Sequence, residues 1–248
     1  SAQRMGCKVI ACDNYNNAPA MQVADEFRVF DMLDGLELRK IVDTVKPDLI
    51  IPEIEAIRTD ELINLESQGH IVVPSARAVS LTMNRDAIRD RVVELGIKTA
   101  NYLYANSDAE LKLAVNKIGL PCIIKPVMSS SGKGQIMINN QKEIETAWEY
   151  ATKKMRGDRN KVIVEELINF DSEITLLTIK QKEGSTLFCP PIGHTQQEGD
   201  YLESWQPVSM NKDLLKKAEE ISKIVTNDLG GFGLFGVEFF LLKEEVIF

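Results

Sequence analysis

The chain has 248 residues, of which 44% are hydrophobic and 27% are charged, and its formal net charge at pH 7 is −8. These values are typical of a globular protein with one or two domains. The negative charge argues against a nucleic-acid binder, which needs a basic face, but a nucleotide site needs only a few local cations. Because neither a transmembrane-length apolar run nor a signal-peptide pattern occurs, we expect a cytoplasmic protein with no membrane partner.

Residues 1 to 83 alternate short apolar runs with helical patterns. The apolar runs predict strands at 8–12, 27–30, 48–52 and 71–73, and the helical patterns predict helices at 36–45 and 60–66. Strands separated by helices of this size indicate a doubly wound α/β domain with a parallel sheet. Ligands bind beyond the carboxyl ends of such strands. Asp13, Glu53 and Glu55 follow predicted strands directly and are therefore candidate substrate contacts.

Residues 84 to 248 predict an α+β domain, with a boundary near Met83. A cap-like Thr82 or Asn84 predicts a helix that runs to about Leu95, and the capping box Ser107–Glu110 predicts a second helix that ends at Ile118. Further helices are expected at 142–154 and 212–229, the last of them ended by two glycines. Strands are expected at 102–104, 161–165 and 233–242, with antiparallel strands between 173 and 190.

The cysteines and histidines predict no metal site. The sequence contains four cysteines without a Cys-x-x-Cys pair: Cys7, Cys12, Cys122 and Cys189. Because three of them lie in apolar runs, we expect buried reduced thiols rather than disulfides or zinc ligands. The two histidines, His70 and His194, are too few and too far apart for a histidine-based site.

The segment 121–138 is the most informative part of the chain. An apolar run ends at Lys125, three serines occupy 129–131, and Gly132-Lys133-Gly134 leads into a second apolar run. This order predicts strand, loop and strand, in which glycines allow close approach, serines donate hydrogen bonds and lysines neutralise charge, as a polyphosphate requires. The spacing is not that of a P-loop. A solvated glycine–serine hairpin is the alternative interpretation.

Several runs along the chain resemble the ATP-grasp superfamily and, within it, the family of formate-dependent phosphoribosylglycinamide formyltransferases. Each run is short, but they follow one another in the family's order: 18–21, 31–35, 52–57, 81–85, 125–135, 162–165, 173–177, 199–207 and 234–238. The resemblance implies an N-terminal pre-ATP-grasp domain at 1–83 and an ATP-grasp domain at 84–248. It also implies that formate is phosphorylated by ATP to formyl phosphate, and that the amine of glycinamide ribonucleotide then takes the formyl group in de novo purine biosynthesis. Members of the family are homodimers that require magnesium.

The resemblance also assigns a set of ATP contacts. The phosphates would be held by Arg85, Lys125, Ser130, Ser131, Gly132, Lys133, Gly134 and Gln135. The adenine edge would meet Glu165, Glu166, Leu167 and Ile168 in a hinge, and the ribose hydroxyls would meet Glu173. Fixed cations and backbone donors are what phosphoryl transfer needs, so the residue types agree with these roles. Alternatively, Lys125 is a lysine that extends into solvent at a strand end, Arg85 forms an exposed ion pair, and the two glutamates end a strand.

Two further carboxylates have implied roles. Glu238 lies in the apolar run 234–242, where an ionised carboxylate is costly unless a partner or cation compensates it, so it is the candidate magnesium ligand. The alternative is an open face of an edge strand. Glu53 matches a position that contacts glycinamide ribonucleotide through its amine, whereas placement at a helix N-terminus would explain it without substrate. No general acid or base is assigned.

Both ends of the sequence are interpreted as cuts through a larger fold. The family begins with a strand and a glycine-containing loop, and it continues past residue 248 with a second metal carboxylate and basic ribonucleotide contacts. We therefore expect little turnover from this chain alone. Two other functions stay open: a different ATP-grasp ligase such as carboxyaminoimidazole ribonucleotide synthase, which uses bicarbonate, and a non-catalytic nucleotide-binding module.

Overall fold

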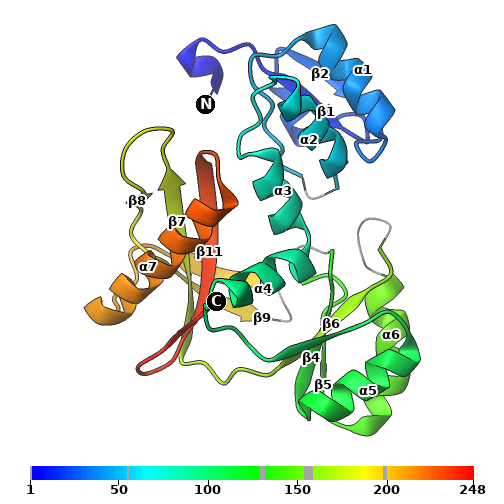
Figure 1. Ribbon diagram of the computed structural model, residues 1–248, viewed down its shortest axis with the longest axis vertical. Coiled ribbons are helices and arrows are strands. Elements are labelled where there is room, and N and C mark those ends of the chain that lie inside the picture. The colour runs from blue at the N-terminus through cyan, green and yellow to red at the C-terminus, as the bar shows by residue number, and fades with distance from the viewer. Residues whose placement is uncertain (1, 55, 129–131, 154–158, 198–199) are drawn as a thin grey trace. The chain divides into compact units, whose positions relative to one another are not determined.

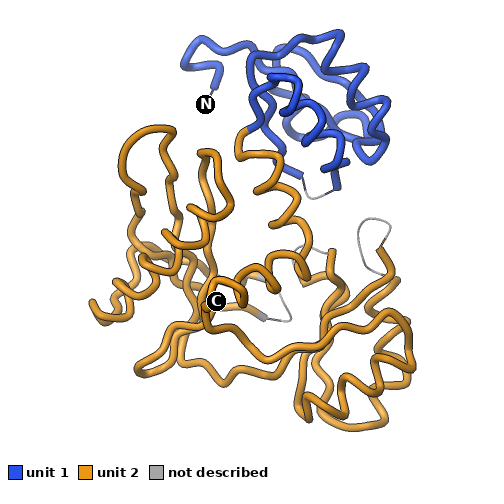
Figure 2. Tube along the Cα trace, viewed as in Figure 1, with its two compact units in different colours: residues 1–72 blue, residues 73–248 orange. Residues whose placement is uncertain are grey.

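The computed structural model describes residues 2–54, 56–128, 132–153, 159–197 and 200–248 (Figure 1). The chain divides into two compact units, residues 1–72 and residues 73–248 (Figure 2). The division falls after Val72, so the helix Ala76–Met83 belongs to the second unit, where Ala78 enters the core. The expected boundary near Met83 would instead place this helix in the N-terminal domain.

The first unit is a small α/β unit. Its elements in chain order are η1 (Ala2–Met5), β1 (Ile10–Asp13), η2 (Pro19–Gln22), β2 (Glu26–Val29), α1 (Gly35–Val45) and α2 (Thr59–Ser67). Strands β1 and β2 pair in parallel, as predicted, with Ile10 opposite Glu26 and Asp13 opposite Val29. Asp34 caps α1 by accepting hydrogen bonds from the N–H groups of Leu36 and Glu37.

The strands predicted at 48–52 and 71–73 do not form regular strands. They meet in parallel, but only through the isolated bridge Ile50–Val72. Leu49 and Ile51 on either side are exposed. The parallel direction agrees with the predicted sheet, but the prediction of two regular strands was wrong, because the extent of pairing depends on neighbouring strands and not on the apolar run alone.

The second unit contains most of the chain. Its helices are α3 (Ala76–Met83), α4 (Arg85–Glu94), α5 (Asp108–Ile118), η3 (Gln141–Glu143), α6 (Ile144–Lys153) and α7 (Lys212–Leu229). Its strands are β3 (Tyr102–Ala105), β4 (Cys122–Pro126), β5 (Ile136–Ile138), β6 (Val162–Glu166), β7 (Ser172–Lys180), β8 (Leu187–Phe188), β9 (Ile192–Gln197), β10 (Asp200–Trp205), β11 (Gly233–Leu241) and β12 (Val246–Ile247).

A four-stranded antiparallel sheet with the order β3-β6-β4-β5 forms one half of this unit. Helices α5 and α6 lie together against the sheet, in green in Figure 1. Alternate residues of β4 are buried, and Cys122 and Ile124 pack there with Leu111 and Val115 of α5 and Ile144 of α6. Ile123 and Lys125 alternate with these residues along β4 and lie on the opposite face of the sheet, so the Lys125 side chain does not enter this core.

A larger sheet with the order β10-β9-β7-β11-β12 forms the other half, and β8 pairs with β7. Helix α7 packs on β7 and β11, and Leu214, Val225 and Leu229 enter the same core as Leu176 and Phe239. The prediction for this helix is confirmed at both ends, since Asn211 caps it and Gly230 follows it with a φ of +76°. Glycine tolerates that left-handed conformation at little cost.

Among the local predictions, the cap of α5 is confirmed, because Ser107 accepts from the Glu110 N–H at 3.3 Å and the helix ends at Ile118. The return bond differs, since the Glu110 carboxylate accepts from the N–H of Asn106 at 2.7 Å. Two other predictions need correction. Asn84 does precede α4, but its side chain makes no capping hydrogen bond to that helix. All four cysteines are free thiols in the described residues, yet only Cys122 is buried, and burial raises the pKa of its thiol to about 11.

Candidate functional site

A buried carboxylate on the four-stranded sheet lies between two cations. Glu165 of β6 is 3% exposed, and its two oxygens receive Lys125 Nζ at 2.6 Å and Arg89 Nη2 at 2.7 Å. In the β4–β6 pairing Ile123 is opposite Glu165, so Lys125 is a diagonal neighbour on the same face. Strand register therefore accounts for the contact between two residues that are 40 positions apart in the sequence.

Helix α4 brings two arginines to this place. Arg85 and Arg89 are four residues apart and therefore lie on one face of the helix. Arg89 also donates to the hydroxyl of Thr99 and, at 2.9 Å, to the carbonyl of Phe248. The guanidinium of Arg85 donates to the carbonyl of Pro126, which ends β4. The start of α4 is thus held against the strand that carries Lys125.

The pKa values of this group have opposing causes. Burial alone would raise the pKa of Glu165, but Lys125 and Arg89 outweigh it and lower the pKa to about 2. Burial lowers the pKa of Lys125, while Glu165 opposes that shift, and burial likewise lowers the pKa of Arg85. Burial disfavours the charged forms of these cations. An additional anionic ligand, such as a phosphate, would stabilise the charged forms.

A pocket adjoins these cations where β6 leads into β7. It is lined by Arg89, Ala100, Ile123, Lys125, Glu165, Glu166, Leu167, Ile168, Phe170, Phe240 and Phe248. Phe170 and Phe240 stack with their ring centroids 4.5 Å apart. An apolar and aromatic wall with a charged group at one side is the usual form of a site for a planar heterocycle.

The predicted hinge residues have different surroundings. All four of them, Glu165 to Ile168, line the pocket. The Glu166 carboxylate also accepts from the backbone N–H and the side-chain amide of Asn101, at 2.8 and 2.9 Å, and the Glu166 N–H donates to the Asn101 carbonyl. This geometry favours Leu167 and Ile168 as backbone contacts to a ligand, and it gives the Glu166 side chain a structural partner.

A second group of polar residues lies on one face of the larger sheet. In the β7–β11 pairing Glu238 is opposite Thr175 and Phe240 is opposite Glu173, so both carboxylates share this face. Tyr201 of β10 donates to Glu238 at 2.5 Å, and the Tyr201 ring lies 4.6 Å from that of His194. His194 in turn hydrogen bonds with the hydroxyls of Ser204 and Thr175, both at 2.8 Å.

Glu173 is incompletely satisfied in this group. Its Oε1 atom is buried and has no hydrogen-bond partner in the described part of the chain, although Gln196 bonds to the carboxylate. Burial raises the pKa of Glu173, and the nearby Glu238 raises it further. A buried acceptor without a donor is costly, so a hydroxyl group from a ligand would fit this atom.

The predicted phosphate loop is described only in its second half. Ser130 and Ser131 lie outside the described residues. Gly132 and Gly134 have φ values of +64° and +77°, and the Gln135 N–H donates to the Gly132 carbonyl at 2.9 Å, which closes a turn that leaves Lys133 exposed. A Cβ atom at Gly134 would lie 2.7 Å from Pro126 Cγ and 2.9 Å from the Ala151 carbonyl oxygen. Only glycine fits there.

Glu53 lies in the first unit, in the segment between α1 and α2, where it is exposed. Glu55 lies outside the described residues. The described contacts do not test the predicted role of Glu53 toward a ribonucleotide.

Sequence reasoning missed Arg89, Asn101 and the hydroxyl partners of His194. The signal for Arg89 was present, because a residue four positions after Arg85 shares its helix face. Asn101 carried no comparable signal, since its contact with Glu166 follows from the pairing of β3 with β6. Tyr201 belonged to a run that resembled the family, but its contact with Glu238 depends on the order of strands in the sheet.

Family profiles and relatives identify the family of this chain. Residues 90–248 match the ATP-grasp domain, and residues 1–83 match the ribonucleotide synthetase preATP-grasp domain. The chain belongs to the ATP-grasp family, with a pre-ATP-grasp domain at its N-terminal end. It is 60% identical over 249 aligned residues to the formate-dependent phosphoribosylglycinamide formyltransferase of Bacteroides thetaiotaomicron, covering 100% of this chain and 64% of that protein.

Solved structures show the same fold. Glycinamide-RNase-transformylase T from Mycobacterium tuberculosis superposes with a TM-score of 0.80 at 30% identity, covering 99% of this chain and 66% of that one. Carboxyaminoimidazole ribonucleotide synthase from Aspergillus clavatus complexed with ATP gives a TM-score of 0.88 at 24% identity, covering 99% and 63%. The chain spans less than two thirds of the length of the curated relatives it matches. In its described part, none of the helices combines the length and the hydropathy of a membrane span.

Proposed function

We propose that this chain carries the ATP site of a formate-dependent phosphoribosylglycinamide formyltransferase. The observation that carries the proposal is the buried group of Lys125, Arg85 and Arg89 around Glu165, beside an aromatic pocket. The 60% identity to a formyltransferase of that name, over the whole of this chain, supports the choice among ATP-grasp enzymes.

The cations would hold the phosphates. Lys125 and Arg85 meet a desolvated setting in which an anion recovers part of the cost of burial. Phosphoryl transfer depends mainly on positioning and on charge stabilisation, so cations fixed by strand register and by α4 serve it directly. Lys133, Gln135 and the two glycines of the β4–β5 turn would contribute backbone and side-chain donors from the other side.

The pocket would hold the rest of the nucleotide. Adenine would lie between the aromatic wall and the 167–168 backbone, with the Glu165 carboxylate near its amino group. The ribose hydroxyls would donate to Glu173, whose buried Oε1 atom lacks a donor among the described residues. The ribose assignment thus uses an acceptor that an empty protein would keep buried at a cost.

Glu238 is the residue that would hold Mg²⁺. Mg²⁺ is commonly bound through one or two carboxylates together with substrate phosphates, so a single strand carboxylate beside a phosphate site fits it. No group of three or more His, Cys, Asp or Glu side chains in metal-binding arrangement occurs in the described part of the chain. When bound, the ion would neutralise charge on the phosphates. Tyr201, which now donates to Glu238, would lose or share that bond.

In the proposed reaction an oxygen of formate attacks the γ-phosphorus of ATP, and ADP leaves. The amine of glycinamide ribonucleotide then attacks the formyl carbon of formyl phosphate, and inorganic phosphate leaves with a proton lost from the amine. Glu53 would orient that amine or accept its proton. We further propose that the protein acts as a homodimer in the cytoplasm, as the family resemblance implies.

The choice of acid tests this proposal against its nearest rival. ADP formation by the complete protein, with glycinamide ribonucleotide and Mg-ATP present, should rise at least tenfold with formate and stay at background with bicarbonate. Stimulation by bicarbonate, together with aminoimidazole ribonucleotide, would favour a carboxyaminoimidazole ribonucleotide synthase. Nucleotide binding without stimulation by either acid would favour a non-catalytic module.

A further inference from the structure

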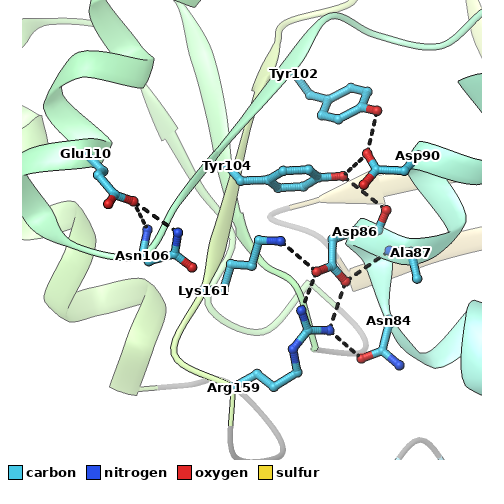
Figure 3. Close-up of polar contacts among 10 residues, drawn as sticks. All are labelled: Asn84, Asp86, Ala87, Asp90, Tyr102, Tyr104, Asn106, Glu110, Arg159 and Lys161. Atoms are coloured by element: carbon cyan, nitrogen blue, oxygen red, sulfur yellow. Dashed lines mark hydrogen bonds and ion pairs between the residues drawn. The ribbon is translucent and has the colours of Figure 1, made fainter.

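A second buried carboxylate lies beside the proposed nucleotide site, at the start of α4. Asp86 is 5% exposed and directly follows Arg85 in the sequence. Its side chain receives the guanidinium of Arg159 and, at 2.8 Å, the ammonium of Lys161 (Figure 3). Burial raises the pKa of this carboxyl, but hydrogen bonds from Arg159 and Lys161 outweigh burial and lower it.

Arg159 contacts the residues on both sides of Arg85. Its Nη1 atom donates to Asn84 Oδ1 at 2.9 Å and to Asp86 Oδ1 at 3.0 Å, while Nη2 donates to the other Asp86 oxygen (Figure 3). A guanidinium can span two acceptors because its donors form a rigid planar fork. The residue that would contact phosphate is therefore flanked by two residues held by one side chain.

Asn84 does not cap α4 with its side chain. Asn84 occupies the N-cap position of α4, but its side-chain oxygen is used by Arg159 and its amide donates to the Ser80 carbonyl at 2.7 Å. The Ala87 N–H in the first turn instead donates to Asp86 Oδ1 at 3.0 Å. Arg159 adds contacts to Asn84 and Asp86 that hold this turn from outside the helix.

The segment 159–161, which contains Arg159, also contacts the chain directly after β4. The Val127 N–H donates to the Lys161 carbonyl at 3.1 Å, and the Arg85 N–H donates to the Val127 carbonyl at 2.8 Å. Lys161 additionally lies 4.0 Å from the centre of the Tyr104 ring. A continuous set of contacts thus links residues 159–161, the end of the strand that carries Lys125, and the backbone of Arg85.

We propose that Arg159 is a positioning residue for nucleotide binding, which acts through Asn84 and Asp86 to hold Arg85 in the orientation that meets phosphate. This inference rests on the proposed ATP site. Arg159 itself reaches Asn84 and Asp86, whereas Arg85 donates to the Pro126 carbonyl beside Lys125. Its effect on ATP is therefore expected to require Arg85.

A thermodynamic cycle tests that requirement. The dissociation constant of Mg-ATP is measured by calorimetry with the complete protein for Arg85→Ala, Arg159→Ala and the double variant. Loss of one charge-assisted contact predicts that Arg85→Ala weakens ATP binding about 30-fold. Arg159→Ala, which removes no contact with ATP itself, should weaken binding less, by about tenfold. The double variant should match Arg85→Ala within about twofold, because an indirect effect disappears when its mediator is removed.

Two further variants separate positioning from general damage to the fold. Arg91 lies on α4 like Arg85, and Arg91→Ala breaks its ion pair with Asp228 of α7. This variant should leave ATP affinity unchanged even where it lowers the melting temperature. Arg159→Lys keeps the positive charge but cannot span Asn84 and Asp86, so it should recover less than half of the lost affinity on a logarithmic scale.

The outcomes are distinct. The inference is overturned if Arg159→Ala leaves ATP affinity unchanged, if it weakens binding equally with and without Arg85, or if Arg85→Ala has no effect. Failure of the unsubstituted protein to bind ATP would overturn both the proposed function and this inference. If the dissociation constants follow the expected cycle but the protein shows no formate-dependent turnover, the inference is supported and only the proposed reaction is contradicted.

Discussion

Glu165 on the four-stranded sheet and Glu173 on the larger sheet are both carboxylates in the proposed nucleotide site, but their surroundings are opposite. Both oxygens of Glu165 are ion-paired, and its pKa is lowered to about 2. Glu173 has a buried oxygen without a donor in the described residues, and its pKa is raised. The smaller sheet thus compensates the charge of its own carboxylate and presents cations to a ligand. The larger sheet instead presents a carboxylate oxygen that lacks a donor, which a ligand hydroxyl would supply.

The largest effect that this comparison predicts is a loss of stability in the variant Glu165→Gln without bound nucleotide. Removing one member of a buried ion pair leaves Lys125 and Arg89 uncompensated, so the free energy of unfolding should fall by about 3 kcal/mol or more. Urea unfolding, monitored by tryptophan fluorescence, measures this change in the free energy of unfolding. Glu149→Gln, at the exposed Glu149–Lys153 pair, is the matched control and should change nothing measurable. Equal stability of the two variants would contradict the buried-pair argument.

The pH dependence of stability should differ in sign between the two carboxylates. The Glu165 pKa falls from 4.5 to about 2 on folding, so the unfolded state binds more protons between these values. Its contribution of about 3 kcal/mol is present above pH 4.5 and is lost as the pH falls toward 2. Glu173, with its raised pKa, should instead remove stability as the pH rises above 4.5. Unfolding of Glu165→Gln and Glu173→Gln, measured from pH 2 to well above pH 4.5 and compared with the unsubstituted chain, checks both signs.

A smaller effect is expected on ligand binding when a cation of the smaller sheet is removed. Lys125→Met should weaken ATP binding by about 2 kcal/mol, or roughly 30-fold, because a charge-assisted contact to phosphate is lost. Calorimetric titration with Mg-ATP measures the change. Lys153→Met, at the exposed pair on α6, is the control. An unchanged dissociation constant for Lys125→Met would show that this lysine serves only Glu165.

The smallest effect concerns Glu173→Gln. Without nucleotide this variant should be as stable as the unsubstituted protein or more stable by under about 1 kcal/mol, because a poorly satisfied buried carboxylate is removed. With ligand, it should lose the preference for ATP over 2′-deoxy-ATP or 3′-deoxy-ATP. Retention of the full preference over both analogues would exclude Glu173 as the acceptor of ribose hydroxyls.

Local sequence signals predicted the elements whose stability is local. Helix α7 begins and ends where its amphipathic pattern and its two following glycines indicated, since the pattern itself defines the face that packs on the sheet. The strands Cys122–Pro126 and Ile136–Ile138 were likewise predictable from their own apolar runs. The single Ile50–Val72 bridge was not, because the extent of pairing depends on partners distant in the sequence.

The site was predictable as a set of residue types but not as a set of contacts. Lys125, Glu165, Glu173 and Glu238 were all singled out from sequence. Their partners Arg89, Gln196 and Tyr201 come from a helix and from two other strands, and only the folded topology brings them together. The Arg159 clamp is a further case, since it joins residues 73 and 75 positions apart.

Gly134 has a consequence for how this loop can change. Its left-handed backbone and the closeness of Pro126 and Ala151 leave no room for a side chain, whereas Lys133 beside it is exposed. In a saturation library over positions 132–135, selection for nucleotide binding should therefore return glycine at 134 and tolerate far more variety in size at 133. Pro126 on β4 and Ala151 on α6 therefore limit which substitutions this loop can accept.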